Sequence, residues 1–595
     1  MMKPILRIIW ALCCAANTID AQLPPVMQST LGNQLQKDEI SRYYIAPQRI
    51  VWMSDTSGDH VKNPEVLLHR GDGQTYFGIN PDKVCQLNNG TGEPSGFIVD
   101  FGLEIQGGIQ LTTATSNRLT PRVRIRFGES VSETMSTVIG DGTTGLDGGA
   151  TNHHAMRDFE IRLPGYGTLE VGNTGFRFMR IDLLDQEARV AFKEIRAVAV
   201  IRDIPYLGSF RCSDTLLNRI WLTGAYTVHL NMQDYLWDGI KRDRMVWMGD
   251  MHPEVMAINT VFGYHHIVPK SLDYGRDNTP LPGWMNGISS YSMWWIIMQH
   301  DWYMYQGRLE YLKEQQVYLT GLLRLLMTKV DDEGRENMMN ERRFLDWPSS
   351  ENPKGVHAGL HALMVLAFQR GALLCRVLGD TEMMEQCEKM VNKMKPYIPD
   401  PNGSKQAAAL MAMAGIVPAE KANREVIAVG GASGFSTFYG YYMLQAKAMA
   451  GDYQGAMDNI RQFWGAMLKL GATTFWEDFN LDWTVNAAGI TDIVPEGKKD
   501  IHRDFGNYCY LGLRHSLCHG WSSGPTSWLT QHVLGISVEE PGCRALRIEP
   551  HLGDLQWAEG TFPTPLGIVK VRHEMRPDGT IDTKVEAPEG VNIVR

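Results

Sequence analysis

The alternation of hydrophobic and polar residues changes twice along the chain. Between residues 46 and 207, short runs such as 123–127 (VRIRF) alternate apolar with polar positions, and Gly, Asn and Asp separate them. A period of two predicts strands with one buried face, so we expect an antiparallel β-sandwich here. The Gly-rich stretch 140–150 is predicted to be a loop, because it lacks the GxGxxG order and a following helix.

From Ser213 onward the hydrophobic period lengthens to that of a helix. Apolar residues at 216, 217, 220 and 221 follow a capping serine. Similar helical patterns recur at 253–264, 288–306, 308–329, 357–379, 381–395, 404–414, 417–428, 434–450, 452–470, 507–518 and 524–534. Helices joined by short loops, without strands between them, predict antiparallel hairpins. Six hairpins would close into an (α/α)6 barrel; an open solenoid, for which we find no repeat, and an irregular bundle are the alternatives.

Beyond about residue 536 the strand-like alternation returns, as in 567–574 (GIVKVRHE). We therefore predict a multidomain α+β chain. Its N-terminal β-sandwich would cover residues 46–207, its helical domain 208–535 and its small C-terminal β-sandwich 536–595.

The N-terminus has the order of a secretory signal peptide: basic residues, a short apolar run, then small residues up to Ala21. We predict a signal peptide over 1–21, a polar linker over 22–45, and a secreted or periplasmic protein. Lipoprotein attachment at the cysteine pair 13–14 is less favoured, because no good lipobox precedes it. No later segment is predicted to span a membrane, since runs such as 360–379 contain His, Gln and Arg.

Charge and cysteine content exclude several classes of protein. The chain has 57 Lys and Arg against 67 Asp and Glu, a formal charge of −10, and no long basic run. A nucleic-acid partner is therefore not expected. The seven cysteines that follow the predicted leader include no CxxC pair, and the chain has no HExxH motif. We expect neither a metal site nor a cofactor.

Two acidic segments carry the candidate chemistry, and both include tryptophan. Residues 238–250 bring together three carboxylates, Asp238, Asp243 and Asp250, with Arg242 and Trp247. Sugar hydrolysis needs one carboxyl group to protonate the leaving oxygen, others to bind hydroxyls, and an aromatic face for the ring. The plainer interpretation is a solvated loop with weak Arg–Asp pairs.

The second segment is 471–478, in which Glu477 follows Trp476. Burial beside an aromatic ring would raise the pKa of this carboxyl group. The alternative is an acidic residue that only complements a helix N-terminus. A third cluster, 516–528, places His519 among aromatic residues, where it would bind a hydroxyl or pack as a structural residue. Of the 16 tryptophans, 13 fall between 221 and 528.

These segments resemble the bacterial α-L-rhamnosidases of glycoside hydrolase family 78. Residues 247–250 match that family's Trp-x-Gly-Asp motif, and 471–477 match its Gly-Ala-Thr-Thr-x-Trp-Glu motif. The resemblance runs from about residue 95 to 575. It implies an (α/α)6 barrel and removal of terminal α-L-rhamnose from a rhamnose-containing oligosaccharide or polysaccharide of plant or microbial origin. The implied mechanism is inverting, with a general acid and a general base.

By the same resemblance, Asp243 would be the general acid and Glu477 the general base. Substrate contacts are assigned to Asp238, Arg242, Trp247, Asp250 and His519, and more loosely to Trp284, Trp294 and Trp347. The family has Glu where this chain has Asp243, which is one methylene shorter, and Glu254 is the alternative acid. This departure keeps a second reading open: a glycan-binding protein, non-catalytic or of altered specificity, on the same scaffold.

Overall fold

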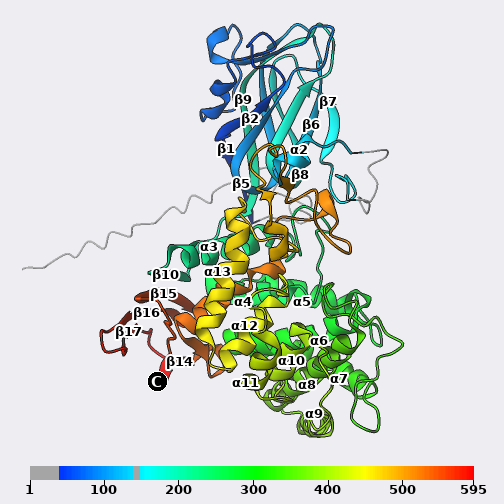
Figure 1. Cartoon of the computed structure of the whole chain (residues 1–595), viewed down its shortest axis with the longest axis vertical. Coiled ribbons are helices and arrows are strands. Elements are labelled where there is room, and N and C mark those ends of the chain that lie inside the picture. Colours follow the sequence, from blue (N-terminus) through cyan, green and yellow to red (C-terminus); the bar gives the residue numbers. More distant parts are fainter. Residues whose placement is uncertain (1–38, 139–147, 595) are drawn as a thin grey trace, which may run out of the picture. The chain divides into compact units, whose positions relative to one another are not determined.

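The computed structural model describes residues 39–138 and 148–594 (Figure 1). The predicted signal peptide, most of the predicted linker and most of the Gly-rich loop lie outside the described residues. The chain divides into two units, residues 1–40 and 41–595. The domains described below all belong to the second unit.

The N-terminal domain is built from nine strands. They are β1 (Ile40–Ile45), β2 (Arg49–Met53), β3 (Val61–Lys62), β4 (Cys85–Asn88), β5 (Gly96–Ser116), β6 (Arg122–Gly128), β7 (Asp158–Arg162), β8 (Gly167–Leu183) and β9 (Arg189–Arg202). Their order is β3-β4-β9-β5-β8-β6-β7, with β1 on β9 and β2 on β5. The predicted linker over 22–45 is therefore too long, because residues 41–45 already belong to β1.

Two long antiparallel strands, β5 and β8, form the centre of this domain. Their register runs from Gly96 opposite Asp182 to Thr113 opposite Gly167, with irregularities after Asp100 and Gly107. Such irregularities bend a strand. The domain's core includes Phe101, whose ring packs against Phe176 of β8, and Phe176 in turn packs against Phe127 of β6. A short helix, α2 (Val131–Met135), follows β6.

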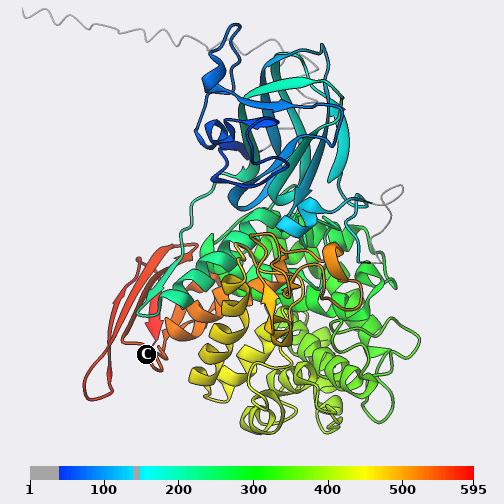
Figure 2. The ribbon, with the colours of Figure 1, turned by 45° about the horizontal axis from the view of Figure 1, so that its top comes forward.

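The helical domain follows the long-period pattern, and its helices form one body in Figure 2. They are α3 (Thr215–Asn231), α4 (Met251–Val261), α5 (Ile267–Asp277), α6 (Ser289–Gln306), α7 (Leu309–Met327), α8 (Pro353–Leu378), α9 (Thr381–Met394), α10 (Lys405–Met413), α11 (Ala419–Ala422), α12 (Gly440–Met449), α13 (Tyr453–Lys469) and α14 (Gly524–Trp528). Helix α5 was not predicted. Its sequence is largely polar, so only one side carries a hydrophobic signal.

The predicted helix at 507–518 is wrong. This segment contains only a short 3-10 turn, Gly512–Arg514. Its next backbone N–H groups donate to carboxylates instead of to the preceding turn: Ser516 to Glu477, and Leu517 to Glu129. Both acceptors come from distant parts of the chain, and local periodicity cannot reveal them.

Helix α8 shows how sequence sets the helix ends. Asn352 accepts a hydrogen bond from the backbone N–H of Gly355, Pro353 occupies the first turn, and Gly379 ends the helix with φ 76°. Among the described helices, α8 alone is long and apolar enough to cross a membrane, but 83% of its most apolar window is buried inside the protein. It packs against α6, α9 and α10, as a core helix does.

The C-terminal domain forms two small sheets. One has the order β10 (Ser209–Cys212), β15 (Trp557–Thr564), β16 (Gly567–Met575) and β17 (Ile581–Glu586); the other joins β13 (Ile536–Val538), β14 (Ala545–Ile548) and β18 (Asn592–Val594). The strand β10 precedes the first barrel helix in sequence yet pairs with β15. This sheet therefore includes one strand from the segment 208–535, which was predicted to be helical.

Candidate active site

The acidic segment 238–250 forms a tight loop between α3 and α4. The backbone of Asp238 and Met245 closes it, because the N–H of Asp238 donates to the Met245 carbonyl at 3.1 Å. The N–H of Met245 donates to Asp238 Oδ1 at 3.0 Å. At its tip, Asp243 and Arg244 both have φ 56°, in the left-handed region that non-glycine residues rarely adopt. Two consecutive strained residues persist only where surrounding contacts hold them.

Glu477 lies in the loop that follows α13, and its backbone is fixed on both sides. Its N–H donates to the Ser516 carbonyl at 3.0 Å. Its own carbonyl accepts from the indole of Trp521 at 2.9 Å and from the hydroxyl of Thr437. The side chain therefore leaves a rigid backbone.

Arg242 connects the two candidate catalytic carboxylates. Its Nη1 donates to Asp243 Oδ1 at 3.1 Å, and its Nη2 donates to Glu477 Oε1. The other oxygens are also held: Trp247 Nε1 donates to Asp243 Oδ2 at 3.1 Å, and the Ser516 N–H donates to Glu477 Oε2 at 3.2 Å. Burial opposes the charge of Arg242, but Glu477 and Asp243 outweigh it and raise the pKa of the guanidinium.

Three carboxylates of the site surround the imidazole of His519. Its Nε2 lies 3.6 Å from Asp238 Oδ2, 3.9 Å from Asp250 Oδ2 and 3.7 Å from Glu477 Oε1. Burial, then the nearby Asp243, raises the pKa of Asp238 well above its usual range. Burial, then Asp238, does the same to the pKa of Asp250. Burial lowers the pKa of His519 to about 4, so this imidazole is neutral at neutral pH.

These side chains line one cavity of about 70 Å³. Of the residues predicted for the site, it contains Asp238, Arg242, Asp243, Trp247, Asp250, Trp347, Glu477 and His519. The others in its lining are Ile288, Tyr291, Arg342, Phe344, Cys509, Tyr510 and Trp521. Tyr291 lies at the start of α6 and donates to Asp250 Oδ1 at 2.7 Å. Apart from Trp521, which lies in the third predicted cluster, no motif marked these additional residues.

Two family models match this chain. The bacterial α-L-rhamnosidase six-hairpin glycosidase domain matches residues 205–533, more than half of the chain. The chain belongs to the bacterial α-L-rhamnosidase family. The bacterial α-L-rhamnosidase C-terminal domain matches residues 535–594. Membership confirms the resemblance noted in the sequence and the predicted fold class.

Individual relatives are distant, and this chain covers little more than half the length of the first two, the Alteromonas and Bacillus proteins. An α-L-rhamnosidase of Alteromonas sp. (strain LOR) is 23% identical over 569 residues, covering 86% of this chain but 57% of the relative. The crystal structure of a family 78 rhamnosidase from Bacillus sp. GL1 has a TM-score of 0.69 at 23% identity, over 89% of this chain and 55% of that one. The structure of a rhamnosidase from Klebsiella oxytoca with rhamnose bound has a TM-score of 0.65 at 19% identity. The match covers 82% of this chain and 95% of the Klebsiella chain.

Three residues assigned from the rhamnosidase resemblance do not line the cavity. Trp294 is 1% exposed and stacks on Tyr442 at 4.5 Å between centroids, so it is a core residue. Trp284 donates to Glu341 Oε2 at 2.7 Å, outside the lining. Glu254, the alternative acid, is fully buried behind the cavity, and burial raises its pKa. The prediction that these residues face the substrate is wrong for this structure.

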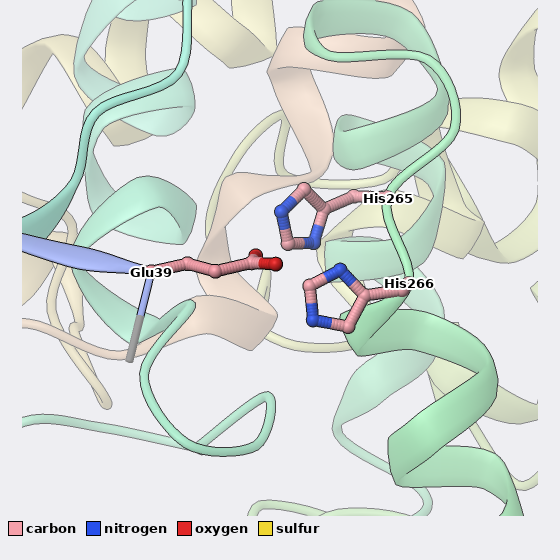
Figure 3. Close-up of side chains that lie close together, drawn as sticks. All are labelled: Glu39, His265 and His266. Carbon is pink, nitrogen blue, oxygen red and sulfur yellow. The ribbon is translucent and has the colours of Figure 1, made fainter. Parts of the chain in front are cut away.

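One acidic cluster resembles a metal site only in residue type. Glu129, Glu133 and His502 converge, but Lys241 Nζ already lies 3.2 Å from Glu129 Oε2 and 3.0 Å from Glu133 Oε1. The ammonium group of Lys241 thus occupies the place that a metal ion would take. Elsewhere, His265 and His266 lie side by side before α5, with ring centroids 4.5 Å apart (Figure 3).

Proposed function

We propose that this chain hydrolyses terminal α-L-rhamnosyl residues of a rhamnose-containing glycan with inversion, using Asp243 as general acid and Glu477 as general base. The observation that carries the proposal is the arrangement around Arg242. One guanidinium separates two carboxylates that enter the same cavity from different loops. Inverting hydrolysis needs two such groups on opposite sides of the scissile bond, with space for water between them.

In the proposed reaction, Glu477 takes a proton from a water molecule, whose oxygen attacks the anomeric carbon. The bond from that carbon to the glycosidic oxygen breaks, and Asp243 transfers its proton to the departing oxygen. Arg242 and the Ser516 N–H donate to the two oxygens of Glu477 and so fix the orientation of the proposed base. Only the general acid must carry a proton at the start.

Both oxygens of Asp243 accept hydrogen bonds, from Arg242 and from Trp247, whereas a general acid must itself donate a proton to the leaving oxygen. The proposal therefore requires that a bound glycoside displaces Arg242 from Asp243. The small cavity agrees with this requirement. At about 70 Å³ it is below the several hundred Å³ typical of ligand sites, so a sugar ring enters only if side chains move.

The other side chains suit a deoxy sugar. Asp238 and Asp250, whose pKa values burial raises, can accept hydrogen bonds from sugar hydroxyls and, when protonated, can also donate to them. The aromatic walls, including Trp247 and Trp347, provide apolar surface for the ring and for the methyl group of rhamnose. A structural neighbour from Klebsiella oxytoca was solved with rhamnose bound. We propose the same sugar for this cavity.

Proton NMR of the protein with an aryl α-L-rhamnoside tests the proposal. We expect β-L-rhamnose as the first anomer released, before mutarotation. Initial release of the α-anomer would refute the inverting assignment. No release, with saturable rhamnose binding in calorimetry, would favour the glycan-binding reading, which rests on Asp243 in the place of Glu.

A further inference from the structure

The strained turn that carries Asp243 is clamped by the N-terminal β domain. The carbonyl of Ile240 accepts from the N–H of Gly175 in β8 at 3.1 Å. Arg244 Nη1 donates to the carbonyl of Asn173, also in β8, at 2.9 Å. Lys241 is paired with Glu129 and with Glu133 in α2. Each neighbour of Asp243 except Arg242 is thus held by the β domain.

Asp243 itself is reached by His154. This histidine lies before β7, and its Nε2 is 3.3 Å from Asp243 Oδ1. Both side chains are 16% exposed, so the contact is partly shielded from water. The neighbouring His153 Nδ1 lies 2.8 Å from the same His154 nitrogen.

The described segment that carries His154, residues 148–157, is anchored at both ends. At its first residue, the carbonyl of Gly148 accepts from the N–H of Leu513 at 2.8 Å. Towards its end, Asn152 Oδ1 accepts from the N–H groups of Arg157 and Asp158 at 2.8 and 3.0 Å. Arg157 is buried and pairs with Glu133 at 3.2 Å. The backbone that carries the imidazole of His154 is therefore held in place by these contacts.

We propose that His154 is a positioning residue for Asp243, so that the N-terminal β domain completes the active site. This inference rests on the proposed function, in which Asp243 is the general acid. An aspartate in place of glutamate reaches less far, and its carboxyl group must be aimed correctly to deliver a proton. Trp247 fixes Oδ2, while Arg242 and His154 share Oδ1. Once a glycoside displaces Arg242, His154 is the partner of Oδ1 that remains.

The charge state of His154 suits this role. Burial lowers its pKa to about 4, against the opposing effect of Asp243, so the imidazole is neutral at neutral pH. A histidine cation would hold Asp243 as the anion and weaken it as an acid. A neutral imidazole orients the carboxyl group without that penalty.

The test compares leaving groups, because an acid matters most when the departing oxygen is basic. Full-length wild type, His154→Ala and His154→Gln are assayed on 2,4-dinitrophenyl and on methyl α-L-rhamnoside. We expect His154→Ala to lower kcat on the methyl glycoside about tenfold to hundredfold and to change kcat on the dinitrophenyl glycoside little. His154→Gln, which retains a polar side chain, should recover part of the loss. Met156→Ala, 57% exposed on the same loop, is the matched control and should behave as wild type.

The outcomes separate this inference from the proposed function. Wild type without activity on either glycoside refutes the proposed function. Active wild type with equal losses on both glycosides in His154→Ala, or with no loss, refutes the role of His154. The double variant His154→Ala/Asp243→Asn should lose no more on the methyl glycoside than Asp243→Asn alone, because both changes act on one group. Additive losses in the double variant would also overturn the inference. If His154→Ala does not fold, the same comparisons are made with His154→Gln.

Discussion

Replacement of Lys241 by methionine tests how the β domain and the barrel are joined. The ammonium group is 1% exposed and lies within 3.2 Å of Glu129 and Glu133. It also donates to the carbonyls of Leu513 and His515 at 2.7 and 2.6 Å. Removing one partner of a buried ion pair costs about 3–5 kcal/mol, because the remaining charge stays buried. We expect the free energy of unfolding to fall by about that amount at pH 7.

Urea unfolding followed by tryptophan fluorescence measures the effect, since most tryptophans lie in the helical domain. Lys313→Met is the matched control. Lys313 pairs with Glu310 at 2.8 Å, but both side chains are more than half exposed, so the change should cost below about 1 kcal/mol. A Lys241→Met protein within about 1 kcal/mol of wild type would refute the argument that this lysine neutralises a buried acidic cluster.

The pH dependence of the same variant gives a second check. Burial raises the pKa of Glu129 to about 7 even with Lys241 present, so without the lysine this carboxyl group binds a proton first. A group whose pKa is raised on folding stabilises the protein most when the pH is below its pKa in the unfolded chain. That stability is lost as the pH rises through its pKa in the folded protein. The free energy of unfolding of Lys241→Met should therefore rise from pH 7 to pH 5, and addition of Glu129→Gln should restore part of the stability at pH 7.

Three further predictions concern the cavity. Glu477→Gln should lower kcat at least 1000-fold, roughly what loss of a general base costs, while rhamnose binding in calorimetry persists; near-normal turnover would contradict its role. Trp347→Ala should raise KM with little change in stability, whereas Trp294→Ala should cost about 3–5 kcal/mol in urea unfolding, and equal effects would contradict their placement. Burial raises the pKa of Asp250 in the folded protein. Its contribution to the free energy of unfolding is therefore lost as the pH rises above the pKa of an aspartate in the unfolded chain, about 4. Asp250→Asn should therefore flatten the decline of stability with pH, and an unchanged slope would contradict this.

The sequence predicted what depends on local pattern. Period and turn residues identified the β, α, β order, and two motifs identified the two candidate catalytic carboxylates, Asp243 and Glu477, which both line the cavity. Periodicity could not distinguish Trp347 from Trp294, because which side of the barrel a ring faces depends on packing between helices. It also could not foresee that Glu129 and Glu477 would take the N–H groups of 516 and 517 and so prevent a helix there.

The missed features share a cause, which is contact between segments far apart in the chain. His154 lies 89 positions before Asp243 and belongs to a different domain, so no spacing rule connects them. Arg242 was predicted to bind substrate from its place in a motif. Its position between Asp243 and Glu477 emerges only when loops from α3 and α13 converge.

The pairing of β10 with β15 affects how the protein is made. Ser209 is opposite Thr561, 352 residues later. At about 5–20 residues per second, the ribosome needs roughly 20–70 s to synthesise that interval. During that time, the backbone groups of β10 that later pair with β15 have no partner and could pair with another strand. Because β10 has only four residues, this unpaired edge is short. Strand β15 thus completes an edge laid down before the first barrel helix, so the pairing of β10 can form only after the helical domain has been synthesised.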